Sequence, residues 1–276
     1  MGSLDLPQIV NLTTKVAPFI QAYDFEVYDI VGTVALFQKY RPVVFAIIGV
    51  YLTGVYFGQK WMEHRPAYNL STPLFFWNAS LALYSIIGTI RGLPEVLYLL
   101  SLPDGTYLSV CAGLPHNYVA SFWAMVFALS KIVELGDTAF IILRKQKLIV
   151  LHWFHHVATL VMFWIGYENY DPAGRFIILN TFVHSFMYSY YALKAIKVKI
   201  PRRISKALTT LQILQMFCGL YVVFSALLFA VQGRPCRRNK NMVYISVSVI
   251  ASFAILFIHF FKTTYYSRHN IKSKGE

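Results

Sequence analysis

The chain has 276 residues, of which 57% are hydrophobic and 17% aromatic, and its formal net charge is +13 at pH 7. Only 13% of the residues are charged, against about 25% in a typical soluble domain. This composition excludes an ordinary soluble domain and indicates a membrane protein with basic loops beside the lipid. Because no cluster of Lys and Arg alternates with exposed aromatic residues on a polar segment, we do not expect nucleic acid as a partner.

A membrane-spanning helix needs about 20 mostly apolar residues. In chain order the candidate spans are 42–58, 74–90, 117–143, 148–167, 176–193, 207–231 and 242–261. The apolar stretch 93–102 is too short to span, so we expect it to lie at the surface or to re-enter the membrane. The sequence therefore predicts an all-α, polytopic membrane protein with seven transmembrane helices. Its parts would be a segment 1–41, a helical domain 42–267 and a tail 268–276.

The distribution of Lys and Arg gives the orientation, since an odd number of spans places the two ends of the chain on opposite sides. The loops 59–73, 144–147 and 194–206 together with residues 262–276 hold 15 of these bases, and the segments on the other side hold 9. The basic stretch 233–240 runs against this bias. We predict a lumenal N-terminus and a cytosolic C-terminus.

This orientation places Cys111 and Cys236 together on the lumenal side. An oxidising lumen permits a disulfide, so we expect these two residues to be linked, with two unrelated free thiols as the alternative. Cys218 lies inside a span and is expected to be a small buried side chain.

Polar side chains recur on single helix faces in four consecutive spans. They are Lys131, Glu134 and Asp137 in the third span, His152, His155 and His156 in the fourth, Asn180, His184 and Tyr188 in the fifth, and Thr209, Gln212 and Gln215 in the sixth. Steps of three or four residues keep side chains on one face. A charge at the bilayer centre costs about 2.5–3.5 kcal/mol, so these faces must look into the protein. An ion-pair network that only locks helices would explain the first set, but all four sets together predict a functional chamber.

Clustered histidines are compatible with three kinds of function. Imidazole binds iron, zinc and copper, and membrane di-iron oxygenases use an H-x-x-H-H box like residues 152–156. Those enzymes need several boxes and this chain has one, so we expect no metal, although a mononuclear site with His184 stays open. A seven-span receptor or proton-coupled carrier is a second possibility.

The third possibility is acyl transfer. A neutral imidazole is a nucleophile and a base near pH 7, and burial keeps it neutral. The basic stretches 144–147 and 194–206 would hold an anionic, phosphate-bearing carrier such as coenzyme A, unless they serve only as membrane anchors.

Four segments carry a resemblance to a known family. They are KIVELGDTAFIILRKQK (131–147), LHWFHH (151–156), NTFVHSFMYSYYAL (180–193) and TTLQILQ (209–215). In order and spacing they resemble the four motifs of the very-long-chain fatty acid elongases, the ELO family. The tryptophan in HWFHH and the lead-in LRKQKLI are most similar to the subgroup that extends saturated and monounsaturated chains of about palmitate length. Residues 272–276 resemble an endoplasmic-reticulum retrieval signal, which implies that membrane as the location.

The resemblance implies a fold in which six of the seven helices ring a closed-ended acyl tunnel. It implies condensation of an acyl-CoA with malonyl-CoA to give 3-oxoacyl-CoA, CO2 and CoA, with both CoA esters as substrates and no bound cofactor. Membrane lipid, the reductase and dehydratase of the elongation cycle, and a second copy of the chain are the expected partners.

We assign roles to the matching residues on this basis. His155 is the expected nucleophile of a two-stage reaction, and His152, His156 and His184 would orient it and move protons. Hydrogen bonds to an oxyanion would come from Asn180, Tyr188, Gln212 and Gln215. Glu134 and Asp137 would fix histidine tautomers or balance Lys131, and Arg144 and Lys145 would bind CoA phosphate. A one-step condensation with histidines acting only as bases is the alternative mechanism.

Overall fold

The computed structural model of the protein describes residues 16–112 and 117–266, and nearly all of its regular structure is helical. The exception is an antiparallel pair of two-residue strands, β1 (Val16–Ala17) and β2 (Ile20–Gln21). The α-helices are α2 (Ile30–Met62), α3 (Ser71–Ser101), α4 (Gly105–Val110), α5 (Tyr118–Glu134), α6 (Gly136–Leu143), α7 (Val150–Glu168), α8 (Ile177–Ala195), α9 (Arg202–Val231) and α10 (Lys240–Phe261). Short 3-10 turns η1 (Asp24–Glu26) and η2 (Pro172–Phe176) and a π turn η3 (Lys262–Tyr266) complete them.

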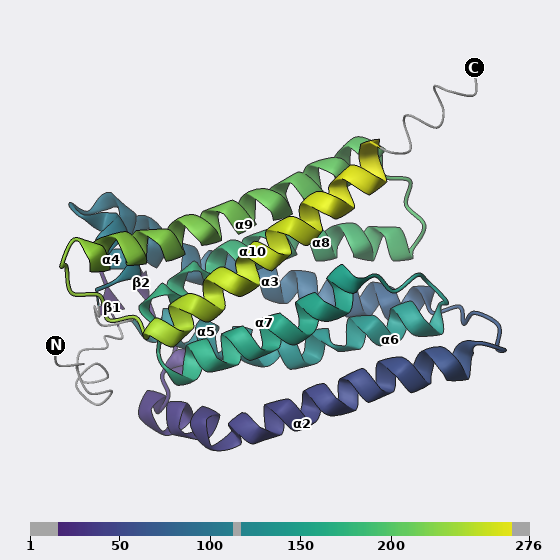
Figure 1. Cartoon of the computed structure of the whole chain (residues 1–276), viewed down its shortest axis with the longest axis horizontal. Coiled ribbons are helices and arrows are strands. Elements are labelled where there is room, and N and C mark those ends of the chain that lie inside the picture. The colour runs from purple at the N-terminus through teal and green to yellow at the C-terminus, as the bar shows by residue number, and fades with distance from the viewer. Residues whose placement is uncertain (1–15, 113–116, 267–276) are drawn as a thin grey trace.

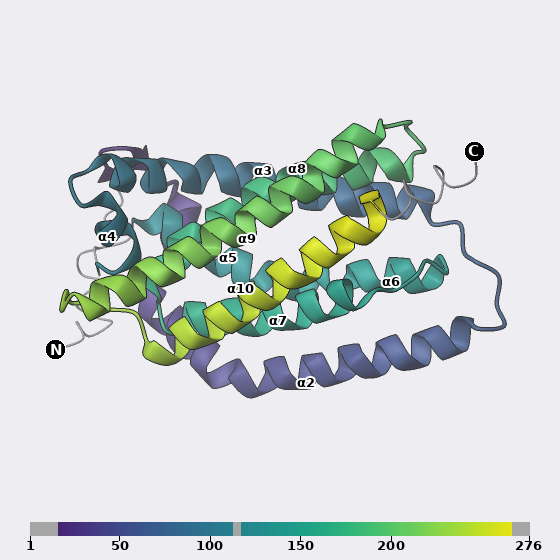
Figure 2. The ribbon, with the colours of Figure 1, turned by 45° about the horizontal axis from the view of Figure 1, so that its top comes forward.

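The long helices lie side by side in one elongated bundle, and the described chain begins at one end of it and finishes at the other (Figure 1). Going around the bundle, α3 packs on α5, α5 on α7, α7 on α10, α10 on α9, α9 on α8, and α8 on α3. Helix α2 stands outside this set, against α6 and α7 (Figure 2). The six helices therefore each have two neighbours within their own set.

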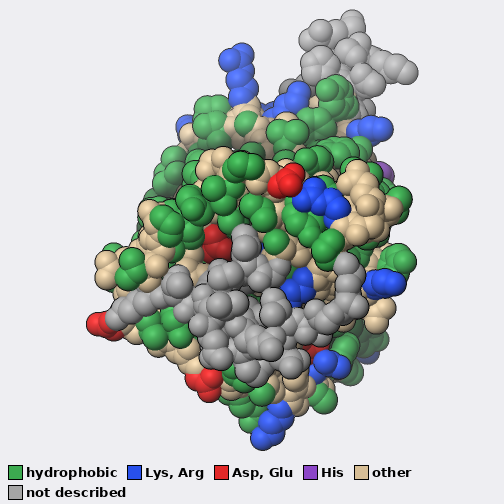
Figure 3. Space-filling model, turned by 90° about the vertical axis from the view of Figure 1, so that its left-hand side faces the viewer, with side chains coloured by type: hydrophobic (Ala, Val, Ile, Leu, Met, Phe, Trp, Pro, Cys, Tyr) green, Lys and Arg blue, Asp and Glu red, His purple; other side chains and the backbone are tan. Residues whose placement is uncertain are grey.

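The outer surface of the bundle is apolar. By length and composition, four described segments are able to cross a membrane: Ile30–Met62, Ser71–Ser101, Arg202–Val231 and Lys240–Tyr266. Large hydrophobic side chains such as Val50, Phe57 and Tyr221 are exposed. Soluble monomers rarely expose apolar patches larger than a few hundred Å². The end of the bundle shown in Figure 3 differs, because acidic and basic side chains appear there among the hydrophobic ones.

Helix α2 starts well before the predicted first span, 42–58. Asp29 caps it by accepting a hydrogen bond from the backbone N–H of Gly32 at 3.0 Å, as Asp commonly does at helix starts. The helix passes through Pro42 without ending. Arg41, which lowers the local hydropathy, is paired with Glu168 of α7 at 2.8 Å. The helix therefore begins before the expected span 42–58 and includes all of it.

The stretch 93–102, expected to lie at the surface or to re-enter the membrane, is continuous with the second expected span, because α3 runs through it to Ser101. Pro94 removes one backbone hydrogen bond without breaking the helix. The Glu95 carboxylate is buried there, and it accepts hydrogen bonds from Arg175 at 2.6 Å and from Asn117 at 3.1 Å. A paired carboxylate of this kind does not prevent a helix from continuing.

The expected span 117–143 is divided into α5 and α6 at Leu135. A Cβ on Gly136 would lie 2.7 Å from the Trp77 ring of α3, so only glycine allows this approach. The break brings the indole of Trp77 within hydrogen-bond distance of Asp137, one of the residues selected for the site.

Two of the cysteines form the expected disulfide, and the third is not buried as expected. Cys111, at the end of α4, forms a disulfide with Cys236 in the connection between α9 and α10. Cys218 of α9 is exposed on the apolar exterior, so the expectation of a buried thiol is wrong. The segment 1–15 and the tail 268–276 lie outside the described residues.

Candidate active site

A cavity of about 830 Å³, here called the main cavity, lies between the six helices and is lined by residues from all of them. Most of the residues selected from the sequence line it: His152, His155, His156, His184, Glu134, Asp137, Arg144, Asn180, Tyr188, Gln212 and Gln215. Lys131 and Lys145 do not. Segments far apart in the sequence thus meet around one space.

The histidines come from two helices. His152, His155 and His156 occupy the first two turns of α7, where the ring centroids of His152 and His156 are 4.4 Å apart and those of His155 and His156 are 5.8 Å apart. His184 lies on α8, with its ring centroid 5.3 Å from that of Tyr188. All four side chains are at least partly buried.

Asp137 connects three helices. Its Oδ1 accepts a hydrogen bond from the Trp77 indole N–H at 2.6 Å, and its Oδ2 accepts one from the Tyr188 hydroxyl at 2.9 Å. The same Oδ2 lies 4.0 Å from His156 Nε2. The carboxylate is therefore placed to orient that imidazole and to balance positive charge on it.

Lys131 lies behind the cavity wall and forms a buried network with Glu134 and Asn180, which line the cavity. Lys131 Nζ donates to Glu134 Oε1 at 2.7 Å and to Asn180 Oδ1 at 3.3 Å, and the Ser130 hydroxyl donates to Glu134 Oε1 at 3.0 Å. The other oxygen of Glu134 lies 3.9 Å from His184 Nδ1. Because Lys131 occupies the oxygen of the Asn180 amide, the amide N–H groups remain as donors. Lys131 therefore acts on the site through its neighbours.

His152 is held by hydroxyl groups. Thr138 Oγ1 lies 3.0 Å from His152 Nε2, and the Tyr51 hydroxyl of α2 lies 2.8 Å from the same Thr138 oxygen. This chain of hydrogen bonds ties the outer helix α2 to the first histidine of the box.

The Nδ1 atoms of His155 and His156 are both buried and have no hydrogen-bond partner among the described residues. What distinguishes His155 from the other three histidines is its surroundings. One face of its ring packs on Phe253, with centroids 4.6 Å apart. His155 also lines a second, narrower cavity of about 140 Å³, here called the distal cavity. Asn180 and Gln215 line both cavities too, so an imidazole and two amides are shared by the two spaces.

The opposite end of the main cavity is basic. Arg144, Lys194 and Arg202 line it there, together with Gln146 and Tyr265. Lys145 was expected to belong to this set, but its ammonium donates to the backbone carbonyls of Glu63 and Arg65 at 3.0 and 2.9 Å. Lys145 therefore holds the connection between α2 and α3.

Several site residues were not selected from the sequence. Trp77 donates to Asp137, Thr138 lies within hydrogen-bond distance of His152, and Tyr51 reaches Thr138. Lys194 lines the basic end. The basic composition of the stretch 194–206, to which Lys194 belongs, does point to the site in the sequence. A single Trp, Thr or Tyr in an apolar span has no sequence pattern that would mark it as a site residue. Within the described residues, no three His, Cys, Asp or Glu side chains are grouped so as to hold a metal ion.

The chain matches known proteins over most of its length. The ELO family model, described as the GNS1/SUR4 family, matches residues 36–273. The chain is 39% identical to very long chain fatty acid elongase 3 of Homo sapiens, over 96% of this chain and 97% of that protein. It is 40% identical to very long chain fatty acid elongase 6 of Drosophila melanogaster, over 84% of this chain and 74% of that protein. Identity to elongase 6 of Homo sapiens is 35%, over 93% and 97% of the two chains. The chain therefore belongs to the ELO (GNS1/SUR4) family, the family of the very-long-chain fatty acid elongases.

Proposed function

We propose that this elongase condenses a long-chain acyl-CoA with malonyl-CoA through an acyl-histidine intermediate on His155, giving 3-oxoacyl-CoA, CO2 and CoA. The observation that carries the proposal is the place of His155. It stands between a wide cavity with a basic end and a narrow apolar one. A thioester carbonyl at this point would have its CoA on one side and its hydrocarbon chain on the other.

The acyl chain would run away from the basic end. Beyond His155 the distal cavity is lined mainly by apolar side chains, among them Met162, Phe163, Phe176 and Val222. Together with the packing of α3, α5, α7, α10, α9 and α8 on one another, this supports a tunnel that six helices surround and that is closed at its far end. With α2 as a further span, seven transmembrane helices would result.

In the first stage an imidazole nitrogen of His155 attacks the thioester carbonyl carbon, and the carbonyl electron pair moves to oxygen. Asn180 and Gln215, which line both cavities as His155 does, would donate hydrogen bonds to that oxyanion. When the intermediate collapses, the C–S bond breaks and CoA leaves. The proton lost from the other ring nitrogen passes through the neighbouring imidazoles to the thiolate.

In the second stage malonyl-CoA loses CO2, and its C–C electron pair becomes that of an enolate. The enolate carbon attacks the acyl carbonyl, the C–N bond to His155 breaks, and the imidazole is restored. His156 and His184 would move protons, since each has a carboxylate within 4.0 Å, from Asp137 and Glu134 respectively. Arg144, Lys194 and Arg202 would bind the CoA phosphates of either substrate, as cations bind anions.

The acyl chain length and the membrane location of the enzyme are inferred from its relatives, its charge distribution and its disulfide. The similarity to elongases 3 and 6 and the HWFHH motif support saturated and monounsaturated acyl chains near palmitate length. The Lys and Arg distribution supports a lumenal N-terminus and a cytosolic C-terminus. A disulfide between Cys111 and Cys236 at the lumenal end fits the endoplasmic reticulum, whose lumen is oxidising.

The direct test is to mix the purified protein with palmitoyl-CoA and carboxyl-labelled malonyl-CoA. The proposal predicts labelled CO2 that depends on the acyl-CoA, together with a 3-oxoacyl-CoA product. His155→Ala should abolish both, whereas His259→Ala, an exposed histidine that lines neither cavity, should not. No release with any acyl-CoA from myristoyl to stearoyl would contradict the proposal, and bound iron with oxygen-dependent oxidation of the chain would favour the oxygenase alternative.

A further inference from the structure

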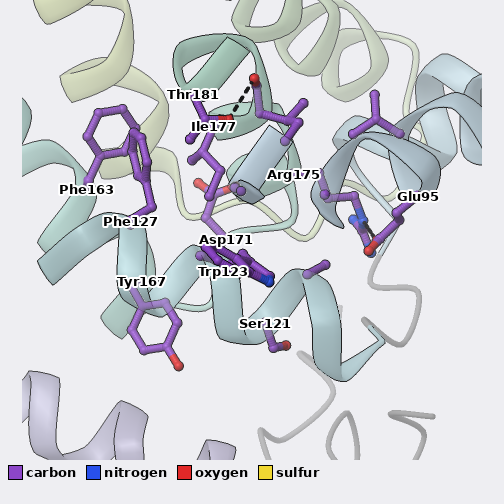
Figure 4. A pocket seen from close by; sticks show the side chains of 18 of the residues that line it. Glu95, Ser121, Trp123, Phe127, Phe163, Tyr167, Asp171, Arg175, Ile177 and Thr181 are labelled. Atoms are coloured by element: carbon purple, nitrogen blue, oxygen red, sulfur yellow. Dashed lines mark hydrogen bonds and ion pairs between the residues drawn. The ribbon is translucent and has the colours of Figure 1, made fainter. Parts of the chain in front are cut away.

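The buried polar contacts between helices differ in where they lead. Beside a third cavity, of about 80 Å³, Arg175 is joined to Glu95 at 2.6 Å (Figure 4). Arg41 of α2 pairs with Glu168 of α7 at 2.8 Å. None of these four residues lines the main cavity, so both pairs link helices without entering the candidate site. The hydroxyl of Tyr51 on α2 is different, because its hydrogen bond continues to a histidine of the site.

Tyr51 lies on the face of α2 that packs on α6. Gly58, two turns later on the same face, approaches α6 so closely that an added Cβ would lie 3.5 Å from the Ile142 side chain. The Arg41 ion pair holds the helix on one side of Tyr51, and the hydrogen bonds of Lys145 to the backbone just after α2 hold it on the other. The Tyr51 hydroxyl is therefore fixed between two anchors.

This hydroxyl is the first member of a chain of three groups. The Tyr51 oxygen lies 2.8 Å from Thr138 Oγ1, and Thr138 Oγ1 lies 3.0 Å from His152 Nε2. Thr138 is 1% exposed, so no solvent competes for its hydroxyl. Within residues 16–112 and 117–266 the two hydroxyls have no further hydrogen-bond partner. Each carries one proton to donate.

Only one arrangement uses both of these protons. If Tyr51 donates to Thr138, the Thr138 proton is directed to His152 Nε2, and both protons have an acceptor. If Thr138 donates to Tyr51 instead, His152 donates to Thr138, and the Tyr51 proton has no acceptor in the described part of the chain. If Thr138 accepts from both neighbours, its own proton is the one left over. An unsatisfied donor is costly where no water is present, so the first arrangement is the stable one.

We infer that Tyr51 is a positioning residue, which through Thr138 keeps His152 in the tautomer that carries its proton on Nδ1. This inference rests on the proposed function. Because Thr138 occupies Nε2, the Nδ1–H is the donor that His152 offers to a ligand in the main cavity, which it lines. Helix α2 stands outside the six helices that surround this cavity, and through Tyr51 it still contributes to the site.

The place of His152 in the chain indicates what this donor does. His152 precedes His155 on α7, and the segment before α7 supplies Arg144 and Gln146 to the basic end of the main cavity. Along α7, His152 therefore lies on the CoA side of His155. A hydrogen-bond donor on that side stabilises the sulfur as the C–S bond breaks and negative charge develops on it. No proton has to leave His152 for this role.

Tyr51→Phe tests the inference, because it removes the hydroxyl and keeps the ring. The Thr138 proton is then free to turn away from His152, and the two tautomers compete. We expect kcat for CO2 release from malonyl-CoA with palmitoyl-CoA to fall roughly 2- to 10-fold, the factor that corresponds to one hydrogen bond. The KM for acyl-CoA should not change, since the basic end of the cavity is untouched. The control is Tyr56→Phe, at an exposed tyrosine of the same helix that lines none of the cavities.

Variants of Thr138 test the second step of the chain. Thr138→Val keeps the shape of the side chain but removes the hydroxyl beside His152, so kcat should fall about 10- to 100-fold, as it does when groups that orient metal-bound histidines are lost. Thr138→Ser keeps the hydroxyl and should recover most of that loss. A role in packing alone would not distinguish serine from valine in this direction, because valine fills the space better.

The double variant separates positioning from packing. If Tyr51 acts through Thr138, Tyr51→Phe should lower kcat no further once Thr138→Val is present. The same factor in both backgrounds, or equal kcat for Tyr51→Phe and Tyr56→Phe, would overturn the inference and leave the elongase activity intact. If Thr138→Val yields no folded protein, the comparison of Tyr51→Phe with Tyr56→Phe decides alone. If the unmodified protein releases no CO2 with any acyl-CoA, the proposed function fails and this inference fails with it.

Discussion

At the scale of single residues, the four histidines of the site are distinguished by their partners. Thr138 lies beside His152, Asp137 beside His156 and Glu134 beside His184. His155 alone among the four histidines lines both the main cavity and the distal cavity. Its Nδ1, like that of His156, has no hydrogen-bond partner in the described part of the chain. A nucleophile needs a free lone pair close to the place where the carbonyl will lie, and of the four histidines only His155 combines a free ring nitrogen with a position between the two cavities.

Asp137→Asn tests the role of the neighbouring carboxylate. The substitution keeps the shape of the side chain but removes the charge that faces His156 and an acceptor used by Tyr188. We expect the turnover number to fall roughly 10- to 100-fold, the range found for groups that orient metal-bound histidines, with little change in the KM for acyl-CoA. The control is Asp104→Asn, at an exposed acid that pairs with Arg234 at 3.0 Å. Equal activity of the two variants would contradict the assigned role.

The sequence predicts the polar faces of the site but not the groups behind them. Steps of three and four residues identify Glu134, Asp137, Asn180 and Gln215, because a helix places such residues on one face. The partner of Asp137 is Trp77, and no periodic signal marks a tryptophan in an apolar span. Charge alone also suggested Lys145 as a ligand, because the sequence does not reveal that its ammonium turns back to two backbone carbonyls.

At the scale of helices, hydropathy predicts where the chain is apolar more reliably than where a helix begins. Both α2 and α3 contain a proline and a charged residue within a few positions, and both continue through them. In each case the charge is paired with a residue from another helix, Arg41 with Glu168 and Glu95 with Arg175. Such tertiary pairs offset the cost of the charge and are invisible to a local pattern.

The segment before α2 is fixed by one buried carboxylate. Glu26 accepts hydrogen bonds from Arg91 Nε at 2.9 Å, from the Trp123 indole N–H at 2.8 Å and from the Tyr23 backbone N–H at 2.8 Å. Burial alone would raise the pKa of Glu26, but the bonds from Arg91, Tyr23 and Trp123 outweigh it and hold the pKa below its ordinary value of 4.5. The charged form of Glu26 thus attaches this segment to α3 and α5.

A pH dependence of stability follows from that shift. Because the unfolded chain binds the proton more tightly than the folded chain, the contribution of Glu26 is complete above pH 4.5 and is lost as the pH falls through its folded pKa. We expect the thermal midpoint of the purified protein to fall in this acidic range, and Glu26→Gln to lower the midpoint at pH 7 and flatten the acidic decline. Glu63→Gln, at an exposed position, should do neither, and the same acidic decline in all three proteins would contradict the account.

At the scale of the whole molecule, the sequence predicts the helical class and the meeting of distant motifs around one chamber. It does not give the order in which the helices pack, because α3 lies beside α8 and α7 beside α10 through contacts between residues far apart in the chain. The volume of the cavities cannot be predicted from the sequence either. The size of the space beyond His155 depends on how side chains from several helices fill it.

The proposed orientation has its own consequence for the whole molecule. In sealed microsomes, an epitope tag at the C-terminus should be removed by added protease, and one at the N-terminus should be protected until detergent is added. The physical reason is the excess of Lys and Arg on the cytosolic side. Protection of the C-terminal tag would reverse the orientation and place Cys111 and Cys236 in a reducing compartment.

The most direct measurement of the central idea uses acyl-CoA alone. The purified protein is mixed with palmitoyl-CoA in the absence of malonyl-CoA, free CoA is followed in time, and the acylated peptide is mapped by mass spectrometry. The acyl-histidine mechanism predicts a burst of CoA stoichiometric with the protein and an acyl group on His155 that disappears when malonyl-CoA is added. CoA release only when malonyl-CoA is present, or an adduct that persists in His155→Ala, would contradict it.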